Sequence, residues 1–253
     1  MENRKVREIT VESRKVCILK SLLLAVLLPF AGWAQQASKS DYLEPIRKEM
    51  MVEWPNNRTV NFVFHGHSVP SGYARTPQVN TLDAYPYQTL VLIKKHFPLA
   101  VVNTITTAIG GEQSEQGSAR FEQDVLPHRP DVLFIDYALN DRGLGVERAE
   151  KAWRSMIEAA LEKQIKVILC TPTPDMSARM GLADEPLTLH SNMIRRLAAE
   201  YHVGLADFYE RFCAIAASGE NLNEYMSQVN HPNAKGHQVA VSAISEWILP
   251  SGD

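Results

Sequence analysis

Short apolar runs alternate with amphipathic stretches along most of the chain. Runs rich in β-branched and aromatic residues lie at 60–64, 100–109, 132–137, 167–170 and 203–206. Between and after them, apolar residues at helical spacing predict helices over 87–96, 121–126, 147–163, 189–201 and 234–248. Short apolar strands that alternate with helices are typical of a parallel sheet covered on both faces. The pattern therefore predicts an α/β fold, a three-layer sandwich with a parallel sheet of about five strands.

The N-terminal residues follow a different pattern. Basic residues precede an apolar run over 22–30, and a small-x-small sequence, Gly32-Trp33-Ala34, follows it. These features describe a secretory signal peptide, and the run is shorter than the roughly twenty apolar residues of a membrane span. We expect residues 1–34 to be a signal peptide that is cleaved after Ala34. The protein would then be secreted or periplasmic, with no stable membrane span. The alternative is an uncleaved N-terminal anchor. A leader with a short helix over 41–52 would occupy 35–58, and one domain would occupy 59–250.

The overall charge adds little to this picture. Acidic side chains number 29 and basic ones 26, so nothing favours nucleic acid or an anionic membrane surface as a partner. Two cysteines, Cys170 and Cys213, follow the predicted cleavage site. One pair in a chain of this length does not make a disulfide scaffold, and we expect two buried thiols.

Several histidines raise the question of a metal. His65, His67, His231 and His237 are present, but the chain has no Cys-x-x-Cys or His-Glu-x-x-His spacing that would indicate zinc. We therefore predict no metal and no cofactor. His237 is expected on the surface of the last helix.

Chemically useful residues follow the predicted strands. Ser68 comes after the first strand, Gly111 after the second and Asn140 after the third, and His231 precedes the last helix. The carboxyl ends of parallel strands meet at one edge of a sheet, where ligands bind. These four residues are therefore expected to converge there.

Acyl transfer requires these residue types. A serine hydroxyl becomes a nucleophile when an imidazole accepts its proton, which assigns these roles to Ser68 and His231. The N–H groups of Ser68 and Gly111 and the Asn140 amide would stabilise the oxyanion that forms. Each residue alone has a simpler interpretation as a helix cap or a turn residue. Together they predict an ester hydrolase with these four as catalytic residues.

At these motifs the chain resembles the SGNH (GDSL-like) hydrolases over nearly all of the part after the predicted cleavage site. The family's Gly-Asp-Ser, oxyanion Gly, Gly-x-Asn-Asp and Asp-x-x-His-Pro motifs correspond to Gly66-His67-Ser68, Gly111, Ala138-Leu139-Asn140-Asp141 and Gln228-Val229-Asn230-His231-Pro232. The resemblance implies a flavodoxin-like α/β/α fold. It also implies a serine esterase that forms an acyl-serine intermediate and acts on short-chain or carbohydrate O-acetyl esters.

Three positions depart from the family pattern: His67, Ala138 and Gln228 replace an acid, a glycine and an acid. The last matters most, because Gln228 could accept a hydrogen bond from His231 Nδ1–H but could not stabilise an imidazolium with a full charge. Other groups that could orient the histidine are a backbone carbonyl and the carboxylates of Glu112, Asp141, Glu224 and Asp207.

The loop after Ser68 is expected to shape the substrate cleft, with Tyr73 and Arg75 contacting a small-molecule or carbohydrate ester. Pro70 stands where a Gly-x-Ser-x-Gly elbow would need its second glycine, which argues against an α/β-hydrolase. Two other functions stay open. One is a degenerate hydrolase that binds glycans, and the other is an acyltransferase that uses the same serine.

Overall fold

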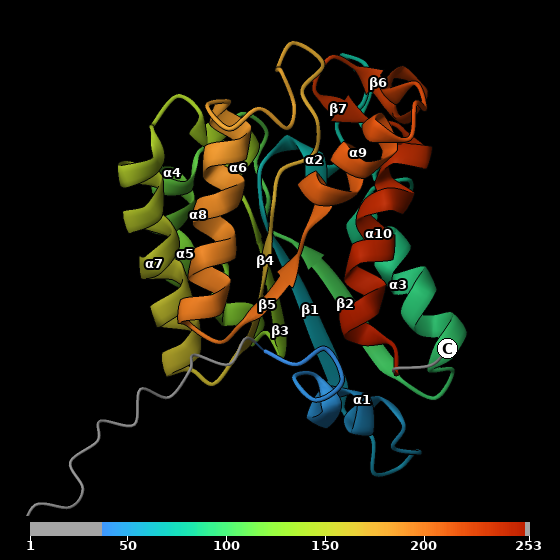
Figure 1. Cartoon of the computed structure of the whole chain (residues 1–253). Coiled ribbons are helices and arrows are strands. Elements are labelled where there is room, and N and C mark those ends of the chain that lie inside the picture. The colour runs from blue at the N-terminus through green and yellow to red at the C-terminus, as the bar shows by residue number, and fades with distance from the viewer. Residues whose placement is uncertain (1–36, 251–253) are drawn as a thin grey trace, which may run out of the picture. The chain divides into compact units, whose positions relative to one another are not determined.

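The computed structural model describes residues 37–250, so the predicted signal peptide lies outside the described residues. Within this part of the chain, five parallel strands form one sheet in the order β2-β1-β3-β4-β5 (Figure 1). The strands are β1 Thr59–Gly66, β2 Val101–Thr106, β3 Val132–Asp136, β4 Lys166–Cys170 and β5 Gly204–Ala206. A separate antiparallel pair comprises β6 Met226–Gln228 and β7 His231–Pro232. The predicted parallel sheet is confirmed.

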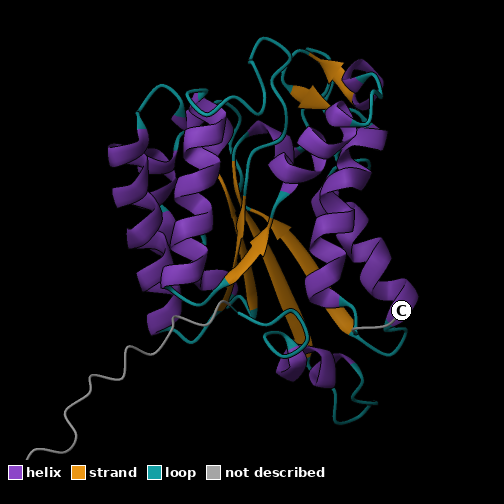
Figure 2. Ribbon diagram, in the orientation of Figure 1, coloured by secondary structure: helices purple, strands orange, loops and turns teal. Residues whose placement is uncertain are grey.

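Helices cover both faces of the sheet, as Figure 2 shows. One layer contains α3 Tyr85–His96, α9 Phe208–Ala217 and α10 Ala234–Ile248, and the other contains α4 Ser114–Ala119, α5 Phe121–Asp124, α7 Val146–Glu162 and α8 Pro186–Glu200. The remaining helices are α1 Glu44–Met50, α2 Ser68–Ser71, α6 Ala138–Asp141 and the 3₁₀ turns Leu126–His128 and Leu222–Tyr225. The three-layer α/β/α prediction is confirmed.

Alternation along the central strands explains why their sequences are continuously apolar. In β1, Phe62 and Phe64 pack into the layer that contains α3 and α10, whereas Val63 packs into the layer that contains α7 and α8. In β3, Phe134 and Leu133 divide in the same way. All five side chains are fully buried, and each burial contributes about 2 kcal/mol from the hydrophobic effect.

One helix of ordinary length lies outside the helices predicted from apolar spacing. Helix α9 begins after Asp207, whose side chain accepts a hydrogen bond from the Glu210 backbone N–H. Phe208 and Phe212, four positions apart, are fully buried. The N-cap and this spacing are the signals that would have predicted the helix.

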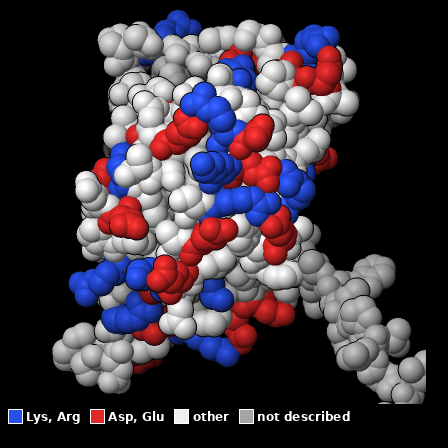
Figure 3. Space-filling view, turned by 90° about the vertical axis from the view of Figure 1, so that its left-hand side faces the viewer, with Lys and Arg blue, Asp and Glu red and all other residues white. Residues whose placement is uncertain are grey.

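The outer face of α7 and α8 carries charges of both signs side by side (Figure 3). Glu150 pairs with Arg154 and Arg196, and Arg154 also pairs with Glu200. This face therefore lacks the single positive sign that binding to a phosphate backbone requires. Between residues 37 and 250, no helix is both long and apolar enough to cross a membrane.

The strand order determines where a ligand can bind. The chain moves from β1 to one neighbour, β2, and then across to the other neighbour, β3. The order 2-1-3-4-5 is that of flavodoxin-like sheets, which bind ligands at this reversal, beyond the carboxyl ends of β1 and β3. Ser68 follows β1 directly, and its helix α2 lies at that edge of the sheet (Figure 1).

Candidate active site

The structure brings together a serine and a histidine that lie 163 positions apart. Ser68 begins α2, His231 lies in β7, and Ser68 Oγ is 2.9 Å from His231 Nε2. Ser68 is 7% exposed and His231 is 8% exposed, so both side chains are largely shielded from water. The distance is that of a hydrogen bond through which an imidazole can take the hydroxyl proton.

The other ring nitrogen of His231 contacts no carboxylate. Its Nδ1 lies 3.1 Å from the Ala74 carbonyl oxygen and 2.6 Å from Gln228 Nε2. The four carboxylates considered from the sequence have other partners: Glu112 pairs with Arg120, Asp141 with Trp153, Glu224 with Lys235 and Asp207 with Arg195. The acceptor that faces His231 Nδ1 is therefore a backbone carbonyl and not a carboxylate.

Gln228 presents the opposite group to the one expected from the sequence. Its Oε1 accepts a hydrogen bond from the Thr76 backbone N–H at 3.1 Å, so its nitrogen faces His231. The expected hydrogen bond from His231 Nδ1–H to a glutamine oxygen is thus absent here. The Thr76 N–H, a backbone donor that cannot be exchanged for an acceptor, is the physical reason.

Gly111 lies in the loop after β2, and Asn140 lies in the short helix α6 that follows β3. Gly111 has φ of 80°, a left-handed conformation that glycine adopts without strain. The Asn140 side-chain amide donates a hydrogen bond to the Glu112 carbonyl oxygen at 2.9 Å, which joins helix α6 to the residue that follows Gly111. Ala138 is helical and is not left-handed, so the family's glycine is not required at that position.

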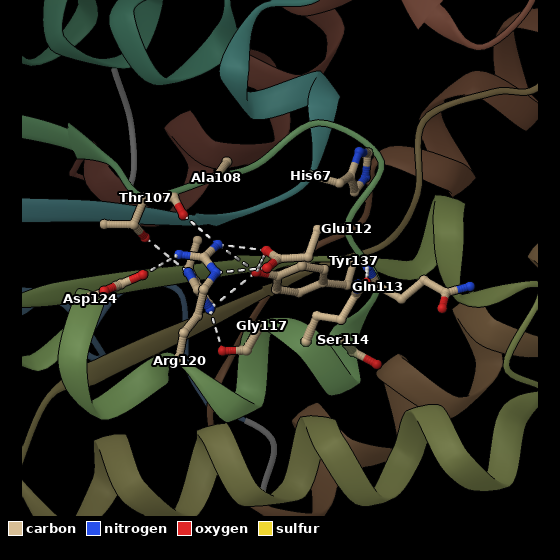
Figure 4. Close-up of polar contacts among 12 residues, drawn as sticks. His67, Thr107, Ala108, Glu112, Gln113, Ser114, Gly117, Arg120, Asp124 and Tyr137 are labelled. Carbon is tan, nitrogen blue, oxygen red and sulfur yellow. Dashed lines mark hydrogen bonds and ion pairs between the residues drawn. The ribbon is translucent and has the colours of Figure 1, made fainter.

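A partly buried ion pair anchors the loop that contains Gly111. The Glu112 carboxylate and the Arg120 guanidinium face each other, with the Tyr137 hydroxyl beside them (Figure 4). Arg120 Nε and Nη2 donate to the two Glu112 oxygens at 2.7 and 2.6 Å, and the Tyr137 hydroxyl donates at 2.8 Å. Such a bidentate pair is both strong and directional. Glu112 thus supports the loop, a role that its position beside Gly111 did not reveal.

His67, which replaces the family's acid, contributes to the helix that carries Ser68. Its Nδ1 accepts a hydrogen bond from the Val69 backbone N–H at 3.2 Å and so caps α2. Its Nε2 lies 3.3 Å from Oδ1 of Asp136, whose other oxygen accepts a hydrogen bond from the Tyr85 hydroxyl at 3.0 Å. The carboxylate therefore comes from the neighbouring strand, and an aspartate at position 67 would place a second buried negative charge against it.

Tyr73 and Arg75 lie beside the β6–β7 pair, near His231. The Tyr73 ring centroid is 6.1 Å from that of His231, and Tyr73 is 40% exposed. Its ring also lies against Gly110, where a Cβ atom would meet it at 2.8 Å. Arg75 Nε donates a hydrogen bond to the Ser227 carbonyl oxygen at 3.3 Å. Tyr73 thus borders His231, whereas Arg75 contacts the strand β6 that pairs with the strand of His231.

Burial keeps two of the histidines near this edge neutral. Burial, and then the proximity of His67, lowers the pKa of His231 below its usual 6.5. His237 is 2% exposed, contrary to the expected surface position, and its Nδ1 accepts a hydrogen bond from the Tyr85 backbone N–H. Burial lowers the pKa of His237 to about 4. Because the α10 face that carries His237 packs on α3, apolar spacing alone misplaced this polar residue.

His65 and His237 are expected to make the protein sensitive to acid. Burial lowers the pKa of each from 6.5 to about 4. As the pH falls from 6.5 to 4, the unfolded chain binds protons that the folded chain does not, so each histidine costs about 3 kcal/mol of stability. Urea denaturation at pH 7 and pH 4.5 would measure this loss.

Matched glutamine variants separate this contribution from that of the carboxylates. Gln at position 237 can still accept from Tyr85, so His237→Gln should lose less stability between the two pH values than the wild type. His96→Gln, at an exposed histidine, should retain the full dependence. Equal pH dependence in all three proteins would refute the assignment.

The two cysteines after the predicted cleavage site differ in burial. Cys170 is buried and Cys213 is only partly buried, and both are free thiols, so the expectation of two buried thiols holds for one of them. Cys213 lies on α9, the helix that was not predicted. Across residues 37–250, no group of three or more His, Cys, Asp or Glu side chains is arranged to hold a metal ion.

Comparison with known families identifies the chain. The model of the GDSL-like lipase/acylhydrolase family matches residues 64–239, which include Ser68, Gly111, Asn140 and His231. The chain belongs to the GDSL-like lipase/acylhydrolase family. This GDSL-like protein is accordingly a carboxylic ester hydrolase.

Solved structures of similar fold include enzymes that act on acetylated polysaccharides. A two-domain esterase active on acetylated mannans matches with a TM-score of 0.68 and 21% identity, over 85% of this chain and 54% of that one. Axe2, an acetylxylan esterase from Geobacillus stearothermophilus, matches with a TM-score of 0.65 and 19% identity, over 75% of this chain and 94% of that one. A putative GDSL-like lipase from Parabacteroides merdae matches with a TM-score of 0.64 and 20% identity, over 75% of this chain and 95% of that one.

These likenesses establish the fold of the GDSL-like protein. The chain spans about half the length of the two-domain esterase. Comparison with curated protein sequences finds no match.

Proposed function

We propose that this GDSL-like protein is an exported serine esterase that removes acetyl or other short acyl groups from carbohydrates. The observation that carries the proposal is the 2.9 Å contact between Ser68 Oγ and His231 Nε2, with a carbonyl acceptor at Nδ1. The structural neighbours active on acetylated mannans and xylans support the choice of substrate. Export depends on the sequence of residues 1–34, and an N-terminus at Gln35 in protein recovered outside the cytoplasm would test it.

In this mechanism His231 takes the Ser68 proton as the hydroxyl oxygen attacks the ester carbonyl. The tetrahedral oxyanion is stabilised by the N–H groups of Ser68 and Gly111 and by the Asn140 amide. His231 then gives its proton to the leaving alcohol, and an acyl group remains on Ser68. Water, with His231 again as the base, attacks this acyl-serine and releases the acid.

Substrate recognition is assigned to the residues that border the pair. Tyr73 offers an exposed aromatic face near His231, on which a sugar ring can pack, and Arg75 offers hydrogen-bond donors to sugar oxygens. Ile109 and Val229, each about half exposed, follow β2 and β6. They add apolar surface close in sequence to Gly111 and to His231.

The chain from Gln35 onward should hydrolyse p-nitrophenyl acetate and release acetate from acetylated xylan or mannan oligosaccharides. A fluorophosphonate should label Ser68, as mass spectrometry of the labelled peptide would show. Tyr73→Ala should raise KM for the oligosaccharide severalfold and leave KM for p-nitrophenyl acetate nearly unchanged. The reason is that only the sugar is expected to pack on the Tyr73 ring. Tyr87→Ala, at an exposed tyrosine of α3, is the control.

The other outcomes identify the alternatives. Binding of oligosaccharide without hydrolysis or labelling would indicate a glycan-binding protein. Labelling of Ser68 with acyl capture by an added sugar, in preference to water, would indicate an acyltransferase.

A further inference from the structure

Two groups compete for one nitrogen of His231. Nδ1 lies 3.1 Å from the Ala74 carbonyl oxygen, which only accepts, and 2.6 Å from Gln228 Nε2, which only donates. A neutral imidazole carries its proton on one nitrogen at a time. A protonated Nδ1 can donate a hydrogen bond only to Ala74, and an unprotonated Nδ1 can accept one only from Gln228. One of the two contacts is therefore always unsatisfied.

The surrounding loop holds the glutamine amide in one orientation. Gln228 Oε1 accepts hydrogen bonds from the backbone N–H of Thr76 at 3.1 Å and from its hydroxyl at 3.4 Å. Turning the amide over would set two N–H donors, those of Gln228 and Thr76, against each other. The contact with Thr76 therefore directs the amide nitrogen toward His231.

This orientation opposes the proton transfer. When Nδ1 accepts from Gln228, the imidazole proton sits on Nε2, the nitrogen 2.9 Å from Ser68 Oγ. In that tautomer His231 cannot take the serine proton. The reactive tautomer has Nδ1–H donating to Ala74 and an unprotonated Nε2. After the transfer, the imidazolium Nδ1–H again faces the Gln228 N–H.

We propose, on the basis of the Ser68–His231 function proposed above, that Gln228 is a positioning residue that restrains the esterase by favouring the unreactive tautomer of His231. The Ala74 carbonyl selects the reactive tautomer and replaces the acid of a serine triad. The rate at which the enzyme acylates depends on the balance between these two hydrogen bonds.

Two variants of similar size test the role of Gln228. Gln228→Met removes the donor and adds no charge, and it should raise kcat about fivefold, the effect of one neutral hydrogen bond. Gln228→Glu places an acceptor at Nδ1 and keeps an oxygen for Thr76, and it should raise kcat at least about tenfold. KM should change little in either. The matched controls are Gln88→Met and Gln88→Glu, which should leave kcat unchanged. The Gln88 side chain hydrogen-bonds with Leu82 and Gln238.

The tautomer itself can be observed without activity. Nitrogen-15 NMR of labelled histidine at pH 8, assigned with His231→Gln, should show His231 protonated at Nε2 in the wild type and at Nδ1 in Gln228→Glu. A merely structural role of Gln228 would not move the proton between the nitrogens.

The proposal is overturned if wild-type His231 is protonated at Nδ1, or if Gln228→Met keeps its fold and loses activity. Those results would show that Gln228 does not restrain acylation by the esterase. The proposed function fails separately, when neither the wild type nor any variant hydrolyses an ester or reacts with a fluorophosphonate. Even then the nitrogen spectrum decides whether Gln228 sets the tautomer.

Discussion

Ser68→Ala is expected to lower kcat for p-nitrophenyl acetate by at least about 10⁴-fold, because it removes the hydroxyl that forms the acyl intermediate in the proposed mechanism. His231→Ala should lower it to a similar extent, since the Ser68 hydroxyl then lacks the base 2.9 Å away. The double variant should be no slower than either single variant, because residues that act as one unit lose their effect together. Steady-state kinetics on the four proteins would measure these losses.

Ser242→Ala is the matched control for this comparison. Ser242 is exposed on α10, and its hydroxyl donates only to the Val239 carbonyl oxygen three positions earlier. It should retain wild-type kcat. If Ser68→Ala kept its activity, or if the losses of the two single variants multiplied in the double variant, the acyl-serine mechanism would be wrong.

Asn140→Ala is expected to lower kcat about 10²- to 10³-fold and to change KM little. The reason is that an oxyanion donor acts on charge that exists only in the transition state. The Asn140 amide donates one hydrogen to the Glu112 carbonyl at 2.9 Å, which holds it beside the Gly111 loop, and it has a second hydrogen to give. Kinetics with p-nitrophenyl acetate would resolve kcat from KM.

Two further variants test whether the loss of kcat comes from the missing donor or from a displaced loop. Asn140→Asp keeps the size and shape of the side chain but replaces the donor with a negative charge, so it should be at least as slow as Asn140→Ala. Asn103→Ala, at an exposed amide on β2 that contacts Asn61, should be unaffected. An active Asn140→Asp, or a large rise in KM with kcat unchanged, would remove Asn140 from the oxyanion role.

Much of the fold could be predicted from local patterns. Helix α10 begins and ends at the predicted residues, Ala234 and Ile248, and every strand of the main sheet overlaps a predicted apolar run. The inner strands β3 and β4 are almost continuously apolar because both of their faces are buried, which is a property that sequence records directly. The four-residue helices α2 and α6 were not predicted, because four residues give little periodicity to recognise. Helix α9 was not predicted either, although its N-cap and the spacing of its buried phenylalanines indicate a helix.

The site divides in a similar way. The order of the strands and the residues that follow them predict that Ser68, Gly111, Asn140 and His231 lie at one edge, because parallel strands end together. The contact between Ser68 and His231 agrees with this prediction. The partner of His231 could not be found in this manner. Ala74 contributes a backbone carbonyl, a group that every residue possesses, so no side chain marks it in the sequence.

Three features were decided only by tertiary packing. The direction of the Gln228 amide depends on a backbone donor 152 positions away, at Thr76. The pairing of His67 with Asp136 depends on the register of two strands. The pairing of Glu112 with Arg120 joins two segments whose contact no local pattern predicts. The sequence by itself determined which chemical groups reach the edge of the sheet, whereas hydrogen-bond partners and directions arose from contacts between distant segments, which carry no local pattern.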